Sequence, residues 1–320
     1  MLIGCLTDNS EASQIKIIGM GQSLSLQVIG IADQYKWLTG QDAVHLKYGI
    51  GGMPYSELKP GTDPYLASIA NGGDVVDIIH GERDANLGTT KAEYISYLNE
   101  WQSAYAADLG FNVPIVIDQM SSRGNADNLA LLSPVTLAQW QAAQNNPSIY
   151  LVGPKYQYQY DKTGLHLIDN HNIWNGEQHG KVIASVLSGE NWQPLEPIKT
   201  TLEGRFITIY FHVPKPPLRV DTTTLPEKEN LGFEWDSEDN NTIQGLTINE
   251  ETIVIELSEA PVNGGWLRYA YTGTADLHSR WGNIKDSDNT ISLHGFDLSN
   301  WLVHFEIFVS NNLHIPVIMR

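Results

Sequence analysis

The sequence predicts an α/β region built on a parallel sheet, followed by an all-β region of the sandwich or jelly-roll-like kind. Short apolar segments alternate with helical ones from about residue 15 to residue 187. After residue 188, segments in which apolar and polar residues alternate are separated by turn-forming clusters. Strands that alternate with helices indicate parallel pairing beneath helices, and short strands with regular turns are typical of a sandwich. Two domains are therefore expected, 1–190 and 191–320.

Four compact segments rich in β-branched residues are the expected strands of the first region. They are residues 15–18, 44–48, 75–79 and 113–117. Helices are predicted between them, for example over 89–107, where aromatic residues recur near helical spacing, and over 133–143, where Pro134 suits a first helical turn. In parallel sheets of this kind, functional groups lie on the loops that follow the carboxyl ends of the strands.

The second region is expected to begin after a linker. Residues 189–200 contain two prolines and show no clear period, which is typical of a connecting segment. The strands expected beyond it are 205–213, 245–248, 252–257 and 266–271, with turns at 239–241 and 263–265.

Composition and charge exclude several classes of protein. The 320 residues are 42% hydrophobic and 18% charged, which is globular composition. The chain has 19 basic and 37 acidic residues and a net charge of −18, so nucleic acid and anionic membranes are not expected partners. No run approaches about 18 consecutive apolar residues, so no membrane-spanning helix is expected. The single cysteine excludes an intrachain disulfide and a cysteine-based metal cluster.

That cysteine, Cys5, lies in a Leu-Ile-Gly-Cys sequence that looks like a bacterial lipidation box. Neither a basic segment nor an apolar stretch of about 7–15 residues precedes it, and secretion requires both. We therefore predict no targeting signal and synthesis in the cytoplasm.

A candidate nucleophile follows the first expected strand directly. Residues 19–25 read Gly-Met-Gly-Gln-Ser-Leu-Ser, which places Ser23 just beyond the strand among glycines. A tight turn there can expose the hydroxyl while backbone amides point inward, and acyl transfer needs a base for the hydroxyl and donors for the oxyanion. Glycine-rich turns also bind phosphate or simply turn the chain, but the phosphate motifs GxGxxG and GxxxxGKS/T are absent.

Three further segments carry groups suited to such a site. Residues 48–54 contain a Gly-Gly pair that can bring a backbone amide close to a ligand. Residues 78–85 read Ile-Ile-His-Gly-Glu-Arg-Asp-Ala and place four ionisable groups directly after an apolar strand, where a merely solvated charge cluster fits poorly. Residues 161–167 and 176–181 offer a histidine base and an orienting carboxylate ahead of the last helix.

In this order, the Gly-Gln-Ser, Gly-Gly, His-Gly-Glu-x-Asp and Gly-Leu-His-Leu blocks resemble the SGNH hydrolase superfamily, in its carbohydrate acetylesterase and sialate O-acetylesterase-like branch. The resemblance covers roughly residues 15–187. It implies a flavodoxin-like α/β/α sandwich that hydrolyses ester-linked acyl groups, usually acetyl groups on sugars, with no metal or organic cofactor.

By position, the resemblance makes Ser23 the nucleophile and His166 the general base, with the backbone amides of Ser23 and Gly52 in the oxyanion hole. The family's acid usually lies three residues before the histidine, where this chain has Thr163. Asp161, five residues before, could take that role on a bulged loop. Otherwise a backbone carbonyl would orient His166 in a Ser–His dyad.

A rival alignment uses His171 as the base and Asp169 as the acid. The spacing from His166 to the Gly-Glu pair at 176–177 matches the family better, so His166 is preferred. Four other histidines lack a partner at a suitable spacing and are expected to be structural, namely His45, His179, His212 and His278.

The third block departs from the superfamily pattern, which commonly has an asparagine donor to the oxyanion there. This chain has Glu82, Arg83 and Asp84 instead, and an ionised carboxylate only accepts hydrogen bonds. The acetylesterase branch shares the Gly-Glu pair, which implies that Glu82 holds the nucleophile loop. Gln22 and Asp84 are expected to support the site, and Arg83 is the alternative donor.

Three C-terminal segments, 268–271, 281–288 and 300–303, resemble the β-domain that follows SGNH esterase domains in bacteriophage tail proteins. The resemblance implies an extracellular or virion-associated protein that removes acetyl groups from a host surface polysaccharide, in a homotrimer for which no heptad or repeat is visible. Trp281, in a polar stretch rich in glycine and asparagine, is the tryptophan expected to be exposed for sugar stacking.

The leading hypothesis is therefore a serine esterase that acts on O-acetylated carbohydrate. One alternative is a lipid or thioester hydrolase, against which no long apolar lid segment is visible. Another is a non-catalytic glycan-binding or structural tail protein with a degraded site. The missing asparagine and the displaced aspartate favour this last alternative, whereas the retained Ser23 and His166 oppose it.

Overall fold

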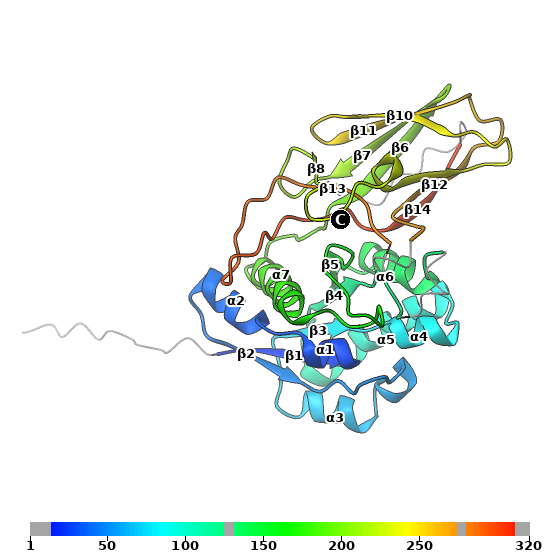
Figure 1. Ribbon diagram of the computed structural model, residues 1–320. Coiled ribbons are helices and arrows are strands. Elements are labelled where there is room, and N and C mark those ends of the chain that lie inside the picture. Colours follow the sequence, from blue (N-terminus) through cyan, green and yellow to red (C-terminus); the bar gives the residue numbers. More distant parts are fainter. Residues whose placement is uncertain (1–13, 125–130, 274–279, 311–320) are drawn as a thin grey trace, which may run out of the picture.

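The computed structural model describes residues 14–124, 131–273 and 280–310. Cys5 and His278 lie outside these ranges. Figure 1 shows helices packed around a central sheet in the N-terminal part of the chain, and a β-rich C-terminal part above them. Within the described ranges, no helix has both the length and the apolar character needed to cross a membrane.

The N-terminal part contains a five-stranded parallel sheet. Its strand order, β2-β1-β3-β4-β5, is the flavodoxin-like order. The strands are β1 (Ile15–Gly21), β2 (Ala43–Lys47), β3 (Val75–Ile79), β4 (Ile115–Gln119) and β5 (Ile149–Pro154). The predicted parallel sheet is confirmed, although β4 begins at Ile115 rather than at residue 113, and β5 was not among the predicted strands.

Helices cover both faces of this sheet. They are α1 (Ser23–Gln27), α2 (Ile31–Thr39), α3 (Asp63–Ile69), α4 (Glu82–Leu87), α5 (Lys91–Leu109), α6 (Pro134–Asn145) and α7 (Asp169–Leu187), with a 3-10 turn η1 (Tyr55–Glu57). Side chains of α5 and α6 share a buried cluster with Ile18 and Ile117. Those of α2 and α7 share a second cluster with Ile17 and Val116. Neighbouring residues belong to different layers because successive strand side chains point to opposite faces.

The described residues of the C-terminal part form three antiparallel sheets, with strand orders β10-β11-β7-β6, β14-β12-β9 and β13-β8. The strands are β6 (Glu196–Glu203), β7 (Phe206–His212), β8 (Arg219–Val220), β9 (Phe233–Asp236), β10 (Ile243–Ile248), β11 (Thr252–Leu257), β12 (Gly265–Tyr269), β13 (Ile284–Lys285) and β14 (Phe305–Val309), and a 3-10 turn η3 (Glu229–Gly232) precedes β9. The prediction that this part is built of β-strands is confirmed, and its sheets are antiparallel.

The linker predicted over residues 189–200 is wrong in its second half. β6 begins at Glu196 and pairs along β7, with an irregular register between Pro197 and Lys199. β6 is also the edge strand of its sheet. An edge strand or a bulge tolerates proline because no neighbouring strand needs the missing N–H. Of the two prolines that suggested a linker, Pro197 therefore lies inside a strand and Pro194 precedes it.

The two parts pack against each other at the carboxyl end of the parallel sheet. One hydrophobic cluster includes residues from both, for example Ile117 of β4 and Phe305 of β14. The Gln119 side chain donates to the His304 carbonyl at 2.9 Å and accepts the His304 N–H at 2.8 Å. The Tyr156 hydroxyl, just beyond β5, donates to the Leu302 carbonyl at 2.7 Å. The end of the sheet that carries the candidate site is thus braced by the C-terminal part.

Candidate active site

Ser23 lies at the carboxyl end of β1, where the strand order reverses. β1 ends at Gly21 and α1 begins at Ser23, with β2 on one side of β1 and β3 on the other. Open α/β sheets bind ligands at such a reversal. Gly21 has a φ of 134°, and a Cβ there would lie 2.0 Å from the Ile79 carbonyl oxygen, so only glycine fits. The close packing of β1 against β3 therefore fixes the turn that presents the serine.

His166 lies on the loop between β5 and α7. The loop doubles back on itself, because the Asp161 N–H donates to the His166 carbonyl at 2.7 Å and Gly164 takes a φ of 66° at the turn. This conformation brings His166 Nε2 to 2.8 Å from Ser23 Oγ, although the two residues are 143 positions apart. The His166 side chain is 28% exposed. The structure therefore places the predicted nucleophile and base in contact at a position open to solvent.

Asp161 lies close to His166 without a hydrogen bond between the side chains. Its Oδ2 is 3.8 Å from His166 Nδ1, which exceeds hydrogen-bond distance. Its Oδ1 accepts from the Thr163 hydroxyl at 2.6 Å and from the Thr163 N–H at 3.0 Å. Partial burial raises the pKa of Asp161, but these hydrogen bonds outweigh it and hold the pKa below its usual value. Asp161 therefore places a negative charge beside the imidazole, and Thr163 holds that carboxylate in place.

The Gly-Gly segment packs directly against the nucleophile turn. A Cβ on Gly49 would lie 2.3 Å from Ser25 Oγ, and a Cβ on Gly51 would lie 3.8 Å from Ser23 Cβ. Gly52, the predicted oxyanion donor, has a φ of 72°, and a Cβ there would meet no heavy atom within 4 Å. The backbone beside Ser23 is therefore that of Gly51, with Gly52 next to it in the chain.

Gln22 and Glu82 hold each other beneath the nucleophile. Gln22 Nε2 donates to Glu82 Oε2 at 2.8 Å, and Gln22 Oε1 accepts the Arg83 N–H at 3.2 Å. The side chains of Gln22 and Glu82 are both buried, whereas Arg83 is exposed. Because Gln22 directly precedes Ser23, these hydrogen bonds tie the nucleophile turn to the first turn of α4.

Asp84 supports the loop that follows the glycine segment. Its Oδ2 accepts the Tyr55 N–H at 2.9 Å and lies 3.4 Å from His80 Nε2. His80 Nε2 is in turn 3.2 Å from the Met53 carbonyl. Burial lowers the pKa of His80. The block that carries Glu82 therefore anchors two loops, one through Gln22 and one through Asp84.

The rival base His171 is engaged elsewhere. Its Nδ1 accepts the Gln159 N–H at 3.1 Å, and its ring lies 5.5 Å from the Trp174 ring. His45 and His179 both face the buried Asp77. His45 Nε2 lies 3.9 Å from Asp77 Oδ2, and His179 Nδ1 lies 2.6 Å from Asp77 Oδ1.

In the part of the chain that the structure describes, no cluster of three or more His, Cys, Asp or Glu residues could hold a metal ion.

A buried lysine beside the site was missed by the sequence analysis. Lys155 follows β5 directly and is fully buried, with Nζ 2.8 Å from Glu82 Oε1 and 3.1 Å from Asp118 Oδ2. Burial lowers the pKa of Lys155, but the carboxylates of Asp118 and Glu82 outweigh burial and raise the pKa above its usual value. The position of Lys155 after a strand end was the available sequence signal, but that strand was itself not predicted.

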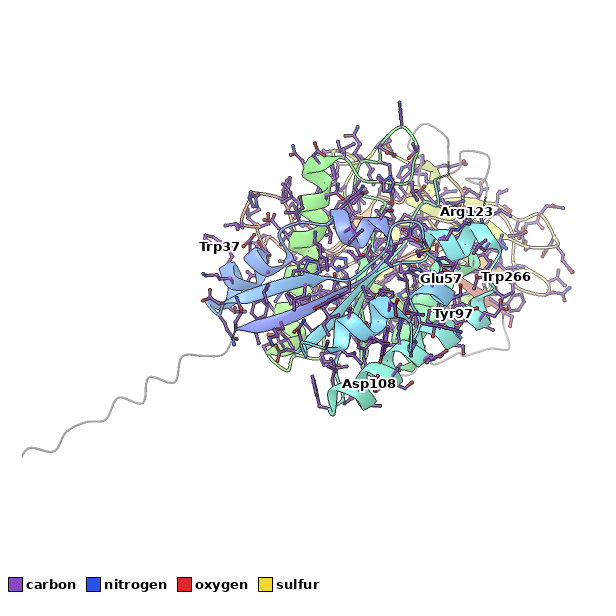
Figure 2. All side chains as sticks on the ribbon, turned by 90° about the horizontal axis from the view of Figure 1, so that it is seen from below. Trp37, Glu57, Tyr97, Asp108, Arg123 and Trp266 are labelled. Atoms are coloured by element: carbon purple, nitrogen blue, oxygen red, sulfur yellow. The ribbon has the colours of Figure 1, made fainter. Side chains whose placement is uncertain are left out.

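The prediction that Trp281 is exposed is wrong. Trp281 is 7% exposed, its Nε1 donates to the Pro226 carbonyl at 3.0 Å, and Lys228 Nζ lies 5.1 Å from its ring centre. The ring therefore fills a buried position despite its polar neighbours in sequence. Trp37 and Trp266 are instead 61% and 41% exposed, and Figure 2 shows them at opposite ends of the molecule.

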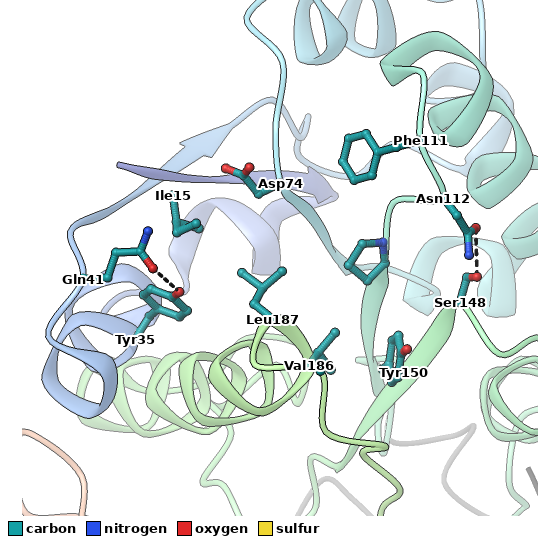
Figure 3. A pocket seen from close by; sticks show the side chains of 12 residues that line it. Ile15, Tyr35, Gln41, Asp74, Phe111, Asn112, Ser148, Tyr150, Val186 and Leu187 are labelled. Carbon is teal, nitrogen blue, oxygen red and sulfur yellow. Dashed lines mark hydrogen bonds between the residues drawn. The ribbon is translucent and has the colours of Figure 1, made fainter. Parts of the chain in front are cut away.

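A hollow of about 460 Å³ lies at the opposite end of the sheet from Ser23 (Figure 3). Its lining includes Ile15, Asp74, Pro114 and Ser148, which open or precede the strands β1, β3, β4 and β5. These are the amino ends of the strands. The hollow is therefore separate from the site formed at their carboxyl ends.

No protein-family model matches the chain, and no curated protein matches it in sequence. In three dimensions it is similar to a carbohydrate acetylesterase from Xanthomonas citri, with a TM-score of 0.61 and 16% identity over 87% of this chain and 63% of that one. This chain thus spans less than two thirds of that protein's length. The fold is SGNH-like. At 16% identity, the similarity establishes the fold alone.

Two other similarities are weaker. A carbohydrate esterase family 3 protein from Talaromyces cellulolyticus aligns with a TM-score of 0.45 and 12% identity, over 55% of this chain and 99% of that one. A lipase/acylhydrolase from Enterococcus faecalis aligns with a TM-score of 0.41 and 13% identity, over 54% of this chain and 97% of that one. Similarity at this level carries no argument about function.

Proposed function

We propose that this protein is a serine esterase that removes O-acetyl groups from carbohydrate through an acyl-enzyme. The observation that carries the proposal is the 2.8 Å contact between Ser23 Oγ and His166 Nε2. The pair lies at the carboxyl end of the sheet and His166 is partly exposed, so an ester can reach both groups. A serine activated by an adjacent histidine is the arrangement that acyl transfer requires.

In the proposed first half-reaction, His166 Nε2 accepts the hydroxyl proton as Ser23 Oγ attacks the acetyl carbonyl carbon. The Asp161 carboxylate, 3.8 Å from His166 Nδ1, stabilises the imidazolium that forms. The tetrahedral intermediate collapses when His166 returns the proton to the departing sugar oxygen, leaving acetylated Ser23. His166 then deprotonates a water molecule that attacks the acyl-enzyme, and returns this proton to Ser23 Oγ as acetate leaves.

Backbone amides are the proposed donors to the oxyanion. Ser23 opens α1, and the first N–H groups of a helix have no acceptor within it. Gly51 brings a second stretch of backbone against Ser23 from the neighbouring loop. Each donor fixed in advance around the developing charge contributes about 10²–10³ in rate. We expect this loop to supply part of the oxyanion stabilisation that the superfamily's asparagine provides.

Carbohydrate is proposed as the carrier of the acetyl group because the chain shares its fold with a carbohydrate acetylesterase. The test measures acetate release from an acetylated oligosaccharide and hydrolysis of p-nitrophenyl acetate and p-nitrophenyl palmitate. The wild-type protein should release acetate from the first two. Ser23→Ala should lower turnover by about 10³-fold or more.

Ser121→Ala is the matched control, because Ser121 Oγ also contacts a histidine, His304 Nε2, at 2.7 Å, but in a buried place. This variant should lose far less turnover than Ser23→Ala, although Ser121 Oγ also accepts the Lys155 N–H at 3.0 Å. A folded wild-type protein without turnover, or undiminished turnover in Ser23→Ala, would contradict the esterase. A preference for the palmitate ester would contradict carbohydrate as the substrate class.

A further inference from the structure

A cluster of buried charged side chains lies next to the nucleophile turn. Lys155 is fully buried between the carboxylates of Glu82 and Asp118, at 2.8 Å and 3.1 Å. Removing a lysine ammonium from water is costly unless carboxylates compensate its charge at close range. A buried ion pair of this kind can fix the positions of the groups around it. The contacts lead in two directions from Lys155.

In one direction, the contacts lead to the nucleophile in two steps. Glu82 holds Lys155 with Oε1 and Gln22 with Oε2, each at 2.8 Å. Gln22 also accepts the Arg83 N–H at 3.2 Å, so its amide is held at both ends. Gln22 is 2% exposed and is the residue that immediately precedes Ser23. A displacement of Glu82 therefore passes directly to the backbone that presents Ser23 Oγ.

In the other direction, the contacts lead to the helix that follows the base. Asp118 Oδ2 lies 3.7 Å from His179 Nε2, and His179 Nδ1 lies 2.6 Å from Asp77 Oδ1. Burial lowers the pKa of His179, but these carboxylates outweigh burial and raise it to about 9. The signs of charge thus alternate along the chain of contacts. Lys155 and His179 are the two ends of the segment that carries His166.

We propose that Lys155 is a positioning residue for the esterase reaction. Through Glu82 and Gln22 it fixes Ser23, and through Asp118 and His179 it fixes the segment that brings His166 to that serine. The inference rests on the proposed function and adds a residue outside the catalytic groups. A displacement of reacting groups by about 1 Å can cost about 100-fold in rate, so loss of this contact should appear in kcat.

The first experiment compares Lys155→Met with Lys181→Met. Lys181 is also a buried lysine paired to a carboxylate, with Nζ 3.0 Å from Asp288, but its contacts lead to the C-terminal part. In Lys155→Met, kcat for p-nitrophenyl acetate should fall about 10- to 100-fold with little change in KM. Hydrogen–deuterium exchange of peptides covering residues 20–27 should quicken. Lys181→Met should leave both unchanged.

A second variant separates positioning from stability. Lys155→Met leaves Glu82 without its cation and Asp118 with His179 alone, and should lower the melting temperature. The double variant Lys155→Met/Glu82→Gln removes one of those charges and should recover part of that temperature. If Lys155 positions Ser23, kcat in the double variant stays below that of Glu82→Gln alone, despite the recovered stability. If Lys155 only stabilises the fold, kcat returns with the melting temperature, which would overturn the proposal.

The outcomes distinguish this inference from the proposed function. A wild-type protein that hydrolyses esters, together with a Lys155→Met variant of wild-type kcat and unchanged exchange over residues 20–27, overturns the positioning role and leaves the esterase intact. A wild-type protein without turnover overturns the esterase, and the exchange experiment then decides alone whether Lys155 orders the serine turn.

Discussion

Two serine–histidine pairs with nearly the same contact distance lie in different surroundings in this molecule. Ser23 Oγ is 2.8 Å from His166 Nε2, and Ser121 Oγ is 2.7 Å from His304 Nε2. In the second pair, His304 Nδ1 donates to the Ala270 carbonyl at 2.8 Å, so Nε2 is the nitrogen that accepts the serine proton. Judged by these hydrogen bonds alone, the second pair is oriented at least as well as the first.

Access and charge separate the two pairs. Ser121 and His304 are 1% and 0% exposed, whereas the His166 side chain is 28% exposed. Burial lowers the pKa of His304 to about 3, so its imidazole resists taking the proton that a general base must accept. His166 has the Asp161 carboxylate 3.8 Å away to stabilise that proton. A short contact between serine and histidine therefore indicates catalysis only where substrate and positive charge can both be accommodated.

The largest expected effect comes from removing the two histidines in turn. His166→Ala should lower kcat/KM by about 10³-fold or more, because Ser23 loses its base. His304→Ala should leave the activity per folded molecule within about threefold, because substrate does not reach it. Steady-state kinetics with p-nitrophenyl acetate, scaled to the folded fraction from circular dichroism, measure both. Equal losses in the two variants would remove the distinction between the pairs.

The next effect concerns alkaline stability through His179. Its folded-state pKa of about 9 lies above the unfolded value of about 6.5, so the folded state binds the proton more tightly. The stabilisation is fully present below about pH 6.5 and is lost as pH rises through 9, by about 3 kcal/mol in total. Urea unfolding from pH 6 to 10 measures the loss. His179→Asn should flatten this part of the profile, and an unchanged profile in that variant would contradict the assignment.

For the buried pair, His304 predicts the opposite pH dependence, a loss of folding stability in acid. The folded-state pKa of His304, about 3, lies below the unfolded value of about 6.5, so protonation favours the unfolded state. The folding stability that depends on a neutral His304 is complete above pH 6.5 and is lost as pH falls toward 3. The loss amounts to about 2 kcal/mol at pH 5. Unfolding experiments on wild type and His304→Gln at pH 7 and pH 5 test this. A pH 5 penalty that is the same in both proteins would contradict it.

The smallest effect tests the carboxylate beside His166. Asp161→Asn keeps the side-chain shape but removes the charge 3.8 Å from Nδ1, and kcat should fall about tenfold. Asp169→Asn is the control, because Asp169 opens α7 and belongs to the rival alignment. Unchanged kinetics in Asp161→Asn would make the pair a dyad. A larger loss in Asp169→Asn would instead favour the rival acid.

Local sequence patterns predicted the parts of the fold that depend on local chemistry. The β-branched run at Val75–Ile79 is a strand with the predicted bounds. The glycines around Ser23 mark a turn that only glycine can form, as the contact between Gly21 and β3 shows. The hydrogen bond from the Asp161 N–H to the His166 carbonyl closes a tight loop that brings the histidine close to Ser23. From the sequence, the residue types in this loop were visible but its conformation was not.

Features that depend on long-range packing could not be predicted in this way. Nothing in the sequence around Lys155 indicates that it is buried, because its partners Glu82 and Asp118 lie far from it in the chain. Ser121 and His304 are 183 positions apart, and nothing near either residue indicates the other. Trp281 lies in a polar stretch, yet its ring is buried because Lys228 and the Pro226 carbonyl come to it from another segment.

Covalent labelling tests the central claim most directly. The folded protein is treated with a fluorophosphonate, which reacts with an activated serine, and the adduct is located by peptide mass spectrometry. We expect one adduct, on Ser23, that is absent in Ser23→Ala and forms much more slowly in His166→Ala, with Ser121 unmodified. An adduct on Ser121, or labelling of Ser23 that is as fast without His166, would contradict it.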